Sequence, residues 1–204
     1  RSDLNKAIEL VYAAKDSGAN AIKLQTYTAE TLTLNHKSED FYITKGPWSG
    51  QYMYDLYKDA YTPWEWHAQL LEIANKIGIT LFSSPFDPTA VDFLEELDMP
   101  AYKIASPEII DIPLIRKVAQ TKKPIIISTG SATISQINEV LDCLNKEEIE
   151  DFALLKCTSE YPAPPEDIHL KTIPHMKDNF KCIVGLSDHT MGIEIPIAAV
   201  ALGA

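Results

Sequence analysis

The sequence has few cysteines, little positive charge and no long apolar run. Three cysteines occur among 204 residues, Cys143, Cys157 and Cys182, and none are in CxxC spacing. This argues against a disulfide framework or a zinc knuckle and favours a reducing cytoplasm. The formal net charge is −11, whereas proteins that bind nucleic acids carry a basic excess. We therefore expect no nucleic-acid partner, and we expect an anionic ligand to be held by a few local cations.

Signals for membranes and for dinucleotides are also missing from the sequence. No apolar run approaches the roughly 18 residues of a spanning helix. The first residues, Arg1, Ser2 and Asp3, do not resemble a charged and then apolar leader. The sequence therefore predicts a cytoplasmic protein without a membrane partner. A Gly-rich fingerprint at a first strand–helix turn is absent, which counts against an open dinucleotide-binding sheet.

Short apolar strands that alternate with amphipathic helices are present instead. Strands are predicted at residues 21–24, 80–83, 101–104, 125–128, 152–157 and 183–186. Helices are predicted from a Ser2/Asp3 cap to Gly18, from a capping box at 62–65 to Gly78, at 89–97, 112–121, 133–144 and 193–201, with a weak helix after the proline-rich loop at 162–165. Residues 25–50 are expected to form a long loop. Parallel neighbouring strands need helical crossovers, so the pattern predicts a parallel α/β sheet.

The number of strands favours a TIM barrel. The first helix has no strand before it and the last has no strand after it, so one strand added at each side gives the eight of a (β/α)8 barrel. We expect residues 1–204 to form one incomplete barrel domain that lacks the first and last strands. An open doubly wound sheet is the alternative.

Lysines near the strand ends are the strongest chemical signal, because barrel active sites lie at the carboxyl ends of the strands. Lys23, Lys103 and Lys156 each lie in an apolar run, where an ammonium group is costly unless it meets an anion or a water-filled cavity. Hydroxyl groups lie at or near strand ends in Ser84, Ser106, Ser128 and Ser159. Together they predict a small ligand with a phosphate and a carboxylate. The alternative is that each lysine pairs with a carboxylate or lies at the rim.

Three further residues are candidates with open alternatives. His189 follows a Gly-Leu-Ser strand end and can ligate a divalent metal, oriented by a group such as Asp188, or it can be structural. Glu108 is either an acid, base or sugar ligand, or a solvated loop carboxylate. Tyr161 contacts a substrate or only packs its loop. The remaining histidines are expected on loops and helix surfaces: His36, His67, His169 and His175.

The strand ends together resemble those of the sialic acid synthase family. The similar segments are residues 23–26, 83–86, 100–106, 128–130, 156–158 with 161–162, and 185–190. Within that family, residues 54–58 and 60–67, with Trp48 upstream, resemble pseudaminic acid synthases more than N-acetylneuraminate synthases. The resemblance implies a transferase that condenses phosphoenolpyruvate with a 2,4-diacetamido-2,4,6-trideoxy-hexose, of altrose configuration for pseudaminic acid, and releases phosphate. It also implies a divalent metal, manganese or magnesium.

The same resemblance implies roles for individual residues. Phosphoenolpyruvate would be surrounded by Lys103, Ser84, Ser106, Ser128, Ser159 and Ser187, with Lys23 close to its charge. The sugar would be faced by Gln25, Glu108 and Tyr161. Lys103 and Glu108 would be the catalytic residues, and His189 would be one metal ligand.

Parts of the family pattern are absent from the sequence. Family members begin with a strand that carries a catalytic glutamate, have a second metal-binding histidine on the last strand, and end in an antifreeze-like SAF domain that reaches over the partner's active site in a homodimer. The resemblance therefore implies that residues 1–204 alone are inactive and poorly stable.

Other functions remain open. Among relatives, the alternatives are N-acetylneuraminate and legionaminate synthesis. Outside the family, they are a Schiff-base aldolase in which Lys103 condenses with a keto acid, and a non-catalytic barrel that binds sugar phosphates.

Overall fold

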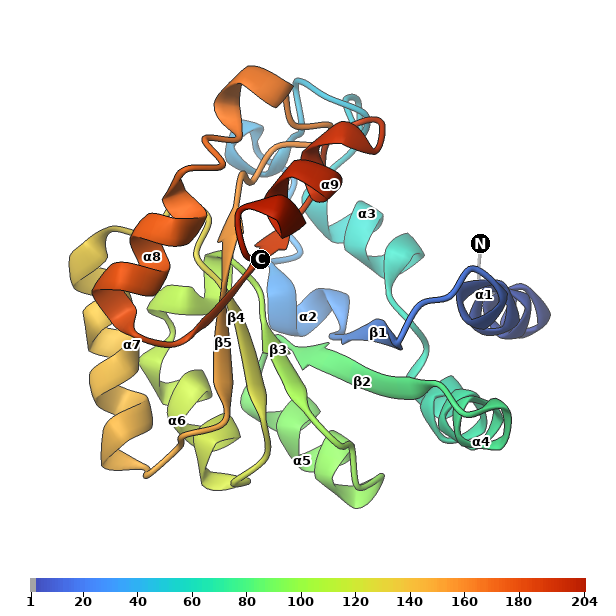
Figure 1. Ribbon diagram of the computed structural model, residues 1–204. Helices are drawn as coiled ribbons and strands as arrows, with labels where there is room; N and C mark the ends of the chain where they lie inside the picture. Colours follow the sequence, from blue (N-terminus) through green and yellow to red (C-terminus); the bar gives the residue numbers. More distant parts are fainter. Residues whose placement is uncertain (1–2) are drawn as a thin grey trace. The chain divides into compact units, whose positions relative to one another are not determined.

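A computed structural model describes residues 3–204 as helices that alternate with parallel strands (Figure 1). Ser2, part of the expected first helix cap, lies outside the described residues. The chain divides into two compact units, Arg1–Tyr102 and Lys103–Ala204. The alternation confirms the predicted α/β class.

The strands of the first unit include one long parallel pair, β1 (Ala21–Thr26) and β2 (Thr80–Pro85). Its elements are α1 (Leu4–Asp16), β1 (Ala21–Thr26), α2 (Ala29–Leu32), the 3-10 turn η1 (Glu39–Phe41), α3 (Met53–Ala60), η2 (Trp64–Trp66), α4 (His67–Ile77), β2 (Thr80–Pro85), α5 (Pro88–Glu96) and the start of β3 (Tyr102–Ile104). Strand β1 pairs with β2 along its whole length, and β2 meets β3 at Ser83 and Tyr102. The buried phenol of Tyr102 donates to Glu95 of α5.

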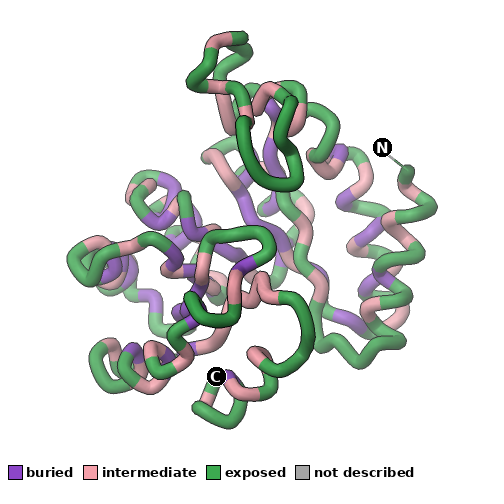
Figure 2. The backbone as a smooth tube through the Cα atoms, turned by 90° about the horizontal axis from the view of Figure 1, so that it is seen from above, coloured by how far each residue is buried: buried purple, intermediate pink, exposed green. Residues whose placement is uncertain are grey.

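The second unit continues the same alternation. Its elements after β3 are η3 (Pro107–Ile110), α6 (Ile112–Gln120), β4 (Ile125–Ser128), α7 (Ile134–Lys146), β5 (Phe152–Cys157), η4 (Pro165–Asp167), α8 (Thr172–Phe180), β6 (Ile183–Ser187) and α9 (Glu194–Ala201). Strands β4, β5 and β6 pair in parallel in that order. Ala199 is the one buried residue of α9, which is otherwise half-buried or exposed (Figure 2).

Several predicted helix ends are confirmed. The Asp3 carboxylate accepts from the backbone N–H groups of Asn5 and Lys6 and starts α1. Thr133 and Gln136 form the predicted capping box of α7. Gly78 ends α4 in the left-handed region, with φ of +73°, where glycine has no steric penalty.

The segment between β1 and α4 differs from the prediction. The expected loop contains α2 and η1, and α3 follows it. The capping box predicted at residues 62–65 is wrong: no side chain caps this end, η2 comes first, and α4 begins at His67. The sequence does not predict α3, because tyrosine is a mediocre helix former. The helix is instead stabilised by contacts with residues outside it. The ring of Tyr57 meets that of Tyr27 edge-on at 6.0 Å.

The expectation that His67 lies on a helix surface is also wrong. His67 is fully buried, and its Nε2 lies 2.8 Å from Thr26 Oγ1, which is 2.6 Å from Ser83 Oγ. Its Nδ1 lies 3.3 Å from the carbonyl of Pro63, so a neutral ring that donates from Nδ1 and accepts at Nε2 fits the site.

We expect His67 to make stability depend on pH. Burial lowers the pKa of His67, so the unfolded chain binds its proton first as the pH falls. This contribution to stability is complete above about pH 6.5 and is lost as the pH falls through the lower, folded pKa. Urea unfolding from pH 7.5 to 5.5 measures it. His67→Gln should lose part of this pH dependence, and an unchanged profile in that variant would contradict the assignment.

Among residues 3–204, no helix is both long enough and apolar enough to cross a membrane.

Candidate functional site

Three of the predicted site residues share one face of the β1–β2 pair. Lys23 and Gln25 alternate with Leu24 along β1, and the parallel register sets Gln25 beside Ser84 of β2. Side chains alternate between the two faces of a strand, so the opposite face is the one where Thr26 bonds to both His67 and Ser83. Lys23 and Gln25 are exposed and Ser84 is fully buried.

Polar atoms without partners coincide with the predicted site. Among the described residues, four buried side-chain atoms have no hydrogen-bond partner, and three of them belong to Ser84, Glu108 and Ser128. The fourth, an oxygen of Asp87, belongs to a carboxylate whose other oxygen caps α5. Buried polar groups in folded proteins are nearly always paired. The three orphan groups therefore leave room for a partner that is not part of residues 3–204, either ordered water or a ligand.

In the second unit, Gly130 lies against two of the predicted serines. Its backbone N–H donates to Ser106 Oγ over 3.1 Å. A Cβ atom at position 130 would overlap Ser159 Oγ and would lie 2.8 Å from Ser106 Oγ and 3.2 Å from Cys157 Sγ. Because Ser106 Oγ accepts from this N–H, its own proton is free to be donated to a ligand oxygen.

Lys103 and Glu108 are the charged candidate residues of the second unit. Lys103 is buried on β3, and its Nζ donates to the carbonyl of Ile104 over 3.3 Å. Burial raises the pKa of the Glu108 carboxyl, and the positive charge of Lys103 opposes that rise. A carboxyl group with a raised pKa holds a proton closer to neutral pH, which suits an acid or base.

His189 and Tyr161 lie together after β6 and β5. Their ring centroids are 4.3 Å apart. His189 Nδ1 lies 2.9 Å from the carbonyl of Thr158, which orients the ring and leaves Nε2 available as a metal ligand. The prediction that Asp188 orients His189 is not supported, because Asp188 accepts instead from the backbone and hydroxyl of Thr190.

Lys156 does not join the other candidates. The register sets Ser128 beside Leu155 and Cys157 beside Ser187, so these four residues share one face and Lys156 points to the other. Sequence alone placed three lysines in one ring because each lies near a strand end. The two-residue period of strand side chains separates Lys156 from Ser128 and Ser187.

Two contributors to this arrangement were not singled out from the sequence. Gly130 lies in the similar segment 128–130 without an expected role, and the Ser-Thr-Gly order at the end of a short strand is the signal that marks it. Thr158 contributes a backbone carbonyl, which no residue pattern reveals. Among residues 3–204, no cluster of three or more His, Cys, Asp or Glu side chains is arranged to hold a metal ion.

The fold and these strand ends define an α/β protein whose cationic and hydroxyl groups suit a small anionic ligand. The profile of the NeuB family matches residues 10–204. The chain belongs to this family. Over 98% of its own length, the chain is 48% identical to a pseudaminic acid synthase of Campylobacter jejuni. Over 99% of its own length, it is 39% identical to an N,N'-diacetyllegionaminic acid synthase of the same organism.

Solved structures agree with the family assignment. The crystal structure of N-acetylneuraminic acid synthetase from Leptospira borgpetersenii, in complex with citrate, superposes with a TM-score of 0.87 at 33% identity and covers 99% of this chain and 66% of that one. The chain spans 59% of the Campylobacter pseudaminic acid synthase and 61% of the legionaminic acid synthase. The fold is therefore that of the sialic acid synthases, and it is compatible with an incomplete barrel.

Proposed function

We propose that the protein containing this chain is a transferase that condenses phosphoenolpyruvate with 2,4-diacetamido-2,4,6-trideoxy-L-altrose and water to form pseudaminic acid and phosphate. The observation that carries the proposal is the set of buried orphan atoms in Ser84, Glu108 and Ser128. They coincide with positions that the sequence assigns to the substrates. The similarity to pseudaminic acid synthases supports the choice of sugar.

The proposed roles follow the chemistry of the side chains. Phosphoenolpyruvate is bound by the ammonium groups of Lys23 and Lys103 and by serine hydroxyls, those of Ser84, Ser106, Ser128, Ser159 and Ser187. Ammonium groups supply charge and hydroxyls supply donors without bulk, which suits a phosphate next to a carboxylate. Gln25, Glu108 and Tyr161 contact the sugar. The enol carbon forms the new bond to the aldehyde carbon, water adds at the neighbouring carbon, and phosphate leaves.

Lys103 and Glu108 are the proposed catalytic residues. The buried ammonium of Lys103 stabilises negative charge that develops on the phosphoenolpyruvate fragment. Burial raises the pKa of Glu108, which suits an acid or base that exchanges a proton with the sugar oxygen.

A divalent metal, manganese or magnesium, fits His189 as one ligand. The Nδ1 contact to the Thr158 carbonyl over 2.9 Å is the outer-shell contact that metal-binding histidines usually have. A bound divalent metal supplies a Lewis acid that polarises the aldehyde oxygen.

We further propose that residues 1–204 are one partial barrel domain of a cytoplasmic homodimer whose antifreeze-like domain lies outside this chain. The three cysteines are free, which suits a reducing compartment.

The test is manganese-dependent phosphate release by the full-length protein. It receives phosphoenolpyruvate and, in turn, the 2,4-diacetamido-trideoxy sugars of altrose and mannose configuration and N-acetylmannosamine. Release with the altrose-configured sugar alone is the expected result. Release only with one of the other two sugars would support the proposed type of reaction but would show that the proposed sugar substrate is wrong. No release with any sugar from a folded protein would contradict the synthase proposal, and borohydride trapping of pyruvate on Lys103 would favour the aldolase.

A further inference from the structure

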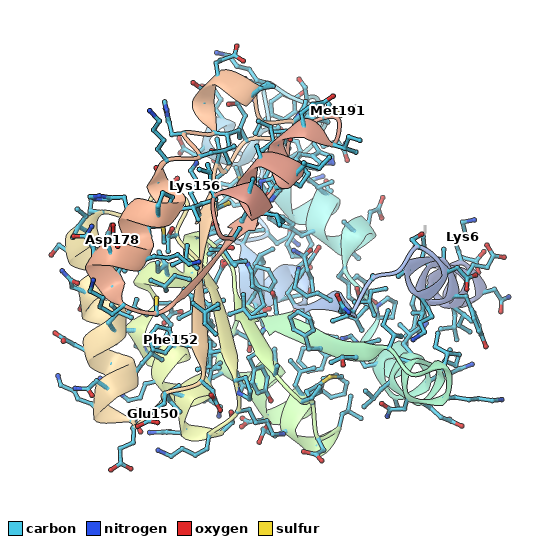
Figure 3. All side chains as sticks on the ribbon, viewed as in Figure 1. Lys6, Glu150, Phe152, Lys156, Asp178 and Met191 are labelled. Atoms are coloured by element: carbon cyan, nitrogen blue, oxygen red, sulfur yellow. The ribbon has the colours of Figure 1, made fainter. Side chains whose placement is uncertain are left out.

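A cavity of about 410 Å³ lies within the second unit on the side of β5 that carries Lys156. Its walls come from α7 and α8, with apolar side chains such as Ile137 and Met176. Its floor contains Lys156 and Thr129, at the ends of β5 and β4. Figure 3 shows Lys156 beside α8. Because Lys156 and Ser128 point to opposite faces, the cavity is separate from the proposed catalytic residues of this unit.

The ammonium group of Lys156 is buried there without a counter-ion. Its Nζ donates to Thr158 Oγ1 over 2.6 Å and to the carbonyl of Cys157 over 3.3 Å. An ammonium group has three N–H donors, so one remains for a further acceptor. Among residues 3–204, no carboxylate lies within 4.0 Å of this nitrogen. Lys156 is only 8% exposed, and a buried unpaired ammonium is costly.

Apart from His175, the rest of the cavity lining carries no ionisable cation or carboxylate. Its polar members are Asn138, His175 and Asn179 at the exposed rim, with Thr129 and Thr172 deeper. No Asp or Glu lines it, although the chain carries 29 acidic residues against 18 lysines and arginines. Burial lowers the pKa of the Lys156 ammonium, whereas an anion that binds beside it favours the charged form.

We propose that this cavity is a binding site for a small organic anion. The carboxylate or phosphate of the ligand contacts Lys156 Nζ, and its less polar body lies between α7 and α8, against Ile137 and Met176. The site stands independently of the proposed synthase reaction. The competing interpretation is that Lys156 only holds Thr158 in position through the hydrogen bond from its Nζ to Thr158 Oγ1.

Calorimetric titration of the full-length protein with benzoate tests the proposal, with the isosteric and neutral benzamide as the charge control. We expect saturable benzoate binding and benzamide binding at least about tenfold weaker, because a hydrogen bond between two charged groups is stronger than one to a neutral amide. Lys156→Met should abolish the preference for benzoate. Lys103→Met should retain it, which separates this cavity from the proposed phosphoenolpyruvate site.

A second pair of variants keeps Lys156 in place. Asn138→Trp fills the mouth of the cavity from α7 and should block benzoate. Asn145→Trp makes the same change at an exposed position of the same helix outside the cavity and should leave binding unchanged. No saturable binding to the unmodified protein, binding that survives Asn138→Trp, or binding lost in Lys103→Met alone would each overturn the proposal.

Discussion

Lys103→Met should lower the turnover of the full-length protein by about 10³-fold, because removing one preorganised group that stabilises charge developing in the transition state lowers kcat by about 10²–10³-fold. Lys103 is buried at 8% exposure on β3 beside Glu108. Methionine keeps most of the volume and loses the charge. Phosphate release under saturating substrates measures the effect, and the pKa of Glu108 should rise further in this variant because the opposing charge is gone.

Lys156→Met is the matched control for that experiment. Lys156 has the same 8% exposure and also lies at the end of a strand, but its side chain points to the face opposite Ser128. We therefore expect a far smaller loss of turnover than in Lys103→Met. Equal losses in the two variants would contradict the assignment of Lys103 to the catalytic residues.

Gly130→Ala is expected to have the second largest effect, a loss of turnover of about 10²-fold, which is the cost of displacing reacting groups by about 1 Å. The added Cβ overlaps Ser159 Oγ and lies 2.8 Å from Ser106 Oγ, so one or both hydroxyls must move. Steady-state phosphate release measures the change, and KM for phosphoenolpyruvate should rise because both serines are proposed to bind it.

Gly185→Ala separates this effect from a general cost of replacing glycine. Neither glycine has a positive φ, and the Cβ at position 185 meets only Leu155 Cδ2, the far end of a flexible side chain. Turnover in Gly185→Ala should stay close to that of the unmodified protein. A Gly130→Ala protein with normal KM and turnover would show that Ser106 and Ser159 do not contact the substrate.

Much of the strand pattern was predictable from the sequence. Residues 125–128 and 152–157 were predicted as strands and are β4 and β5. Each is a short apolar run with marked ends, and the helices between them carry caps such as the Thr133 box. The alternation of such runs with helices restricts the architecture to a parallel α/β class.

Other features were not predictable because they depend on tertiary contacts. His67 lies in a helix whose pattern predicts a surface, but it is buried, and its Nε2 contacts Thr26, which in turn bonds to Ser83. The face of the sheet to which Lys156 points follows only from the register of β5 with β4 and β6, which the sequence does not show. The orienting group of His189 is a backbone carbonyl, and the side-chain pattern of a sequence does not reveal which carbonyls are used.

We propose that buried hydroxyls without a protein partner, such as that of Ser84, bind phosphoenolpyruvate, and the adjacent Ser83 provides the matched control. Ser83 and Ser84 are both fully buried, but Ser83 Oγ is bonded to Thr26 and Ser84 Oγ has no partner among the described residues. Equilibrium binding of phosphoenolpyruvate and urea unfolding are measured for Ser83→Ala and Ser84→Ala in the full-length protein. Ser84→Ala should weaken binding about tenfold or more without loss of stability, whereas Ser83→Ala should lose about 1 kcal/mol of stability and keep its affinity. Unchanged affinity in Ser84→Ala would contradict the claim.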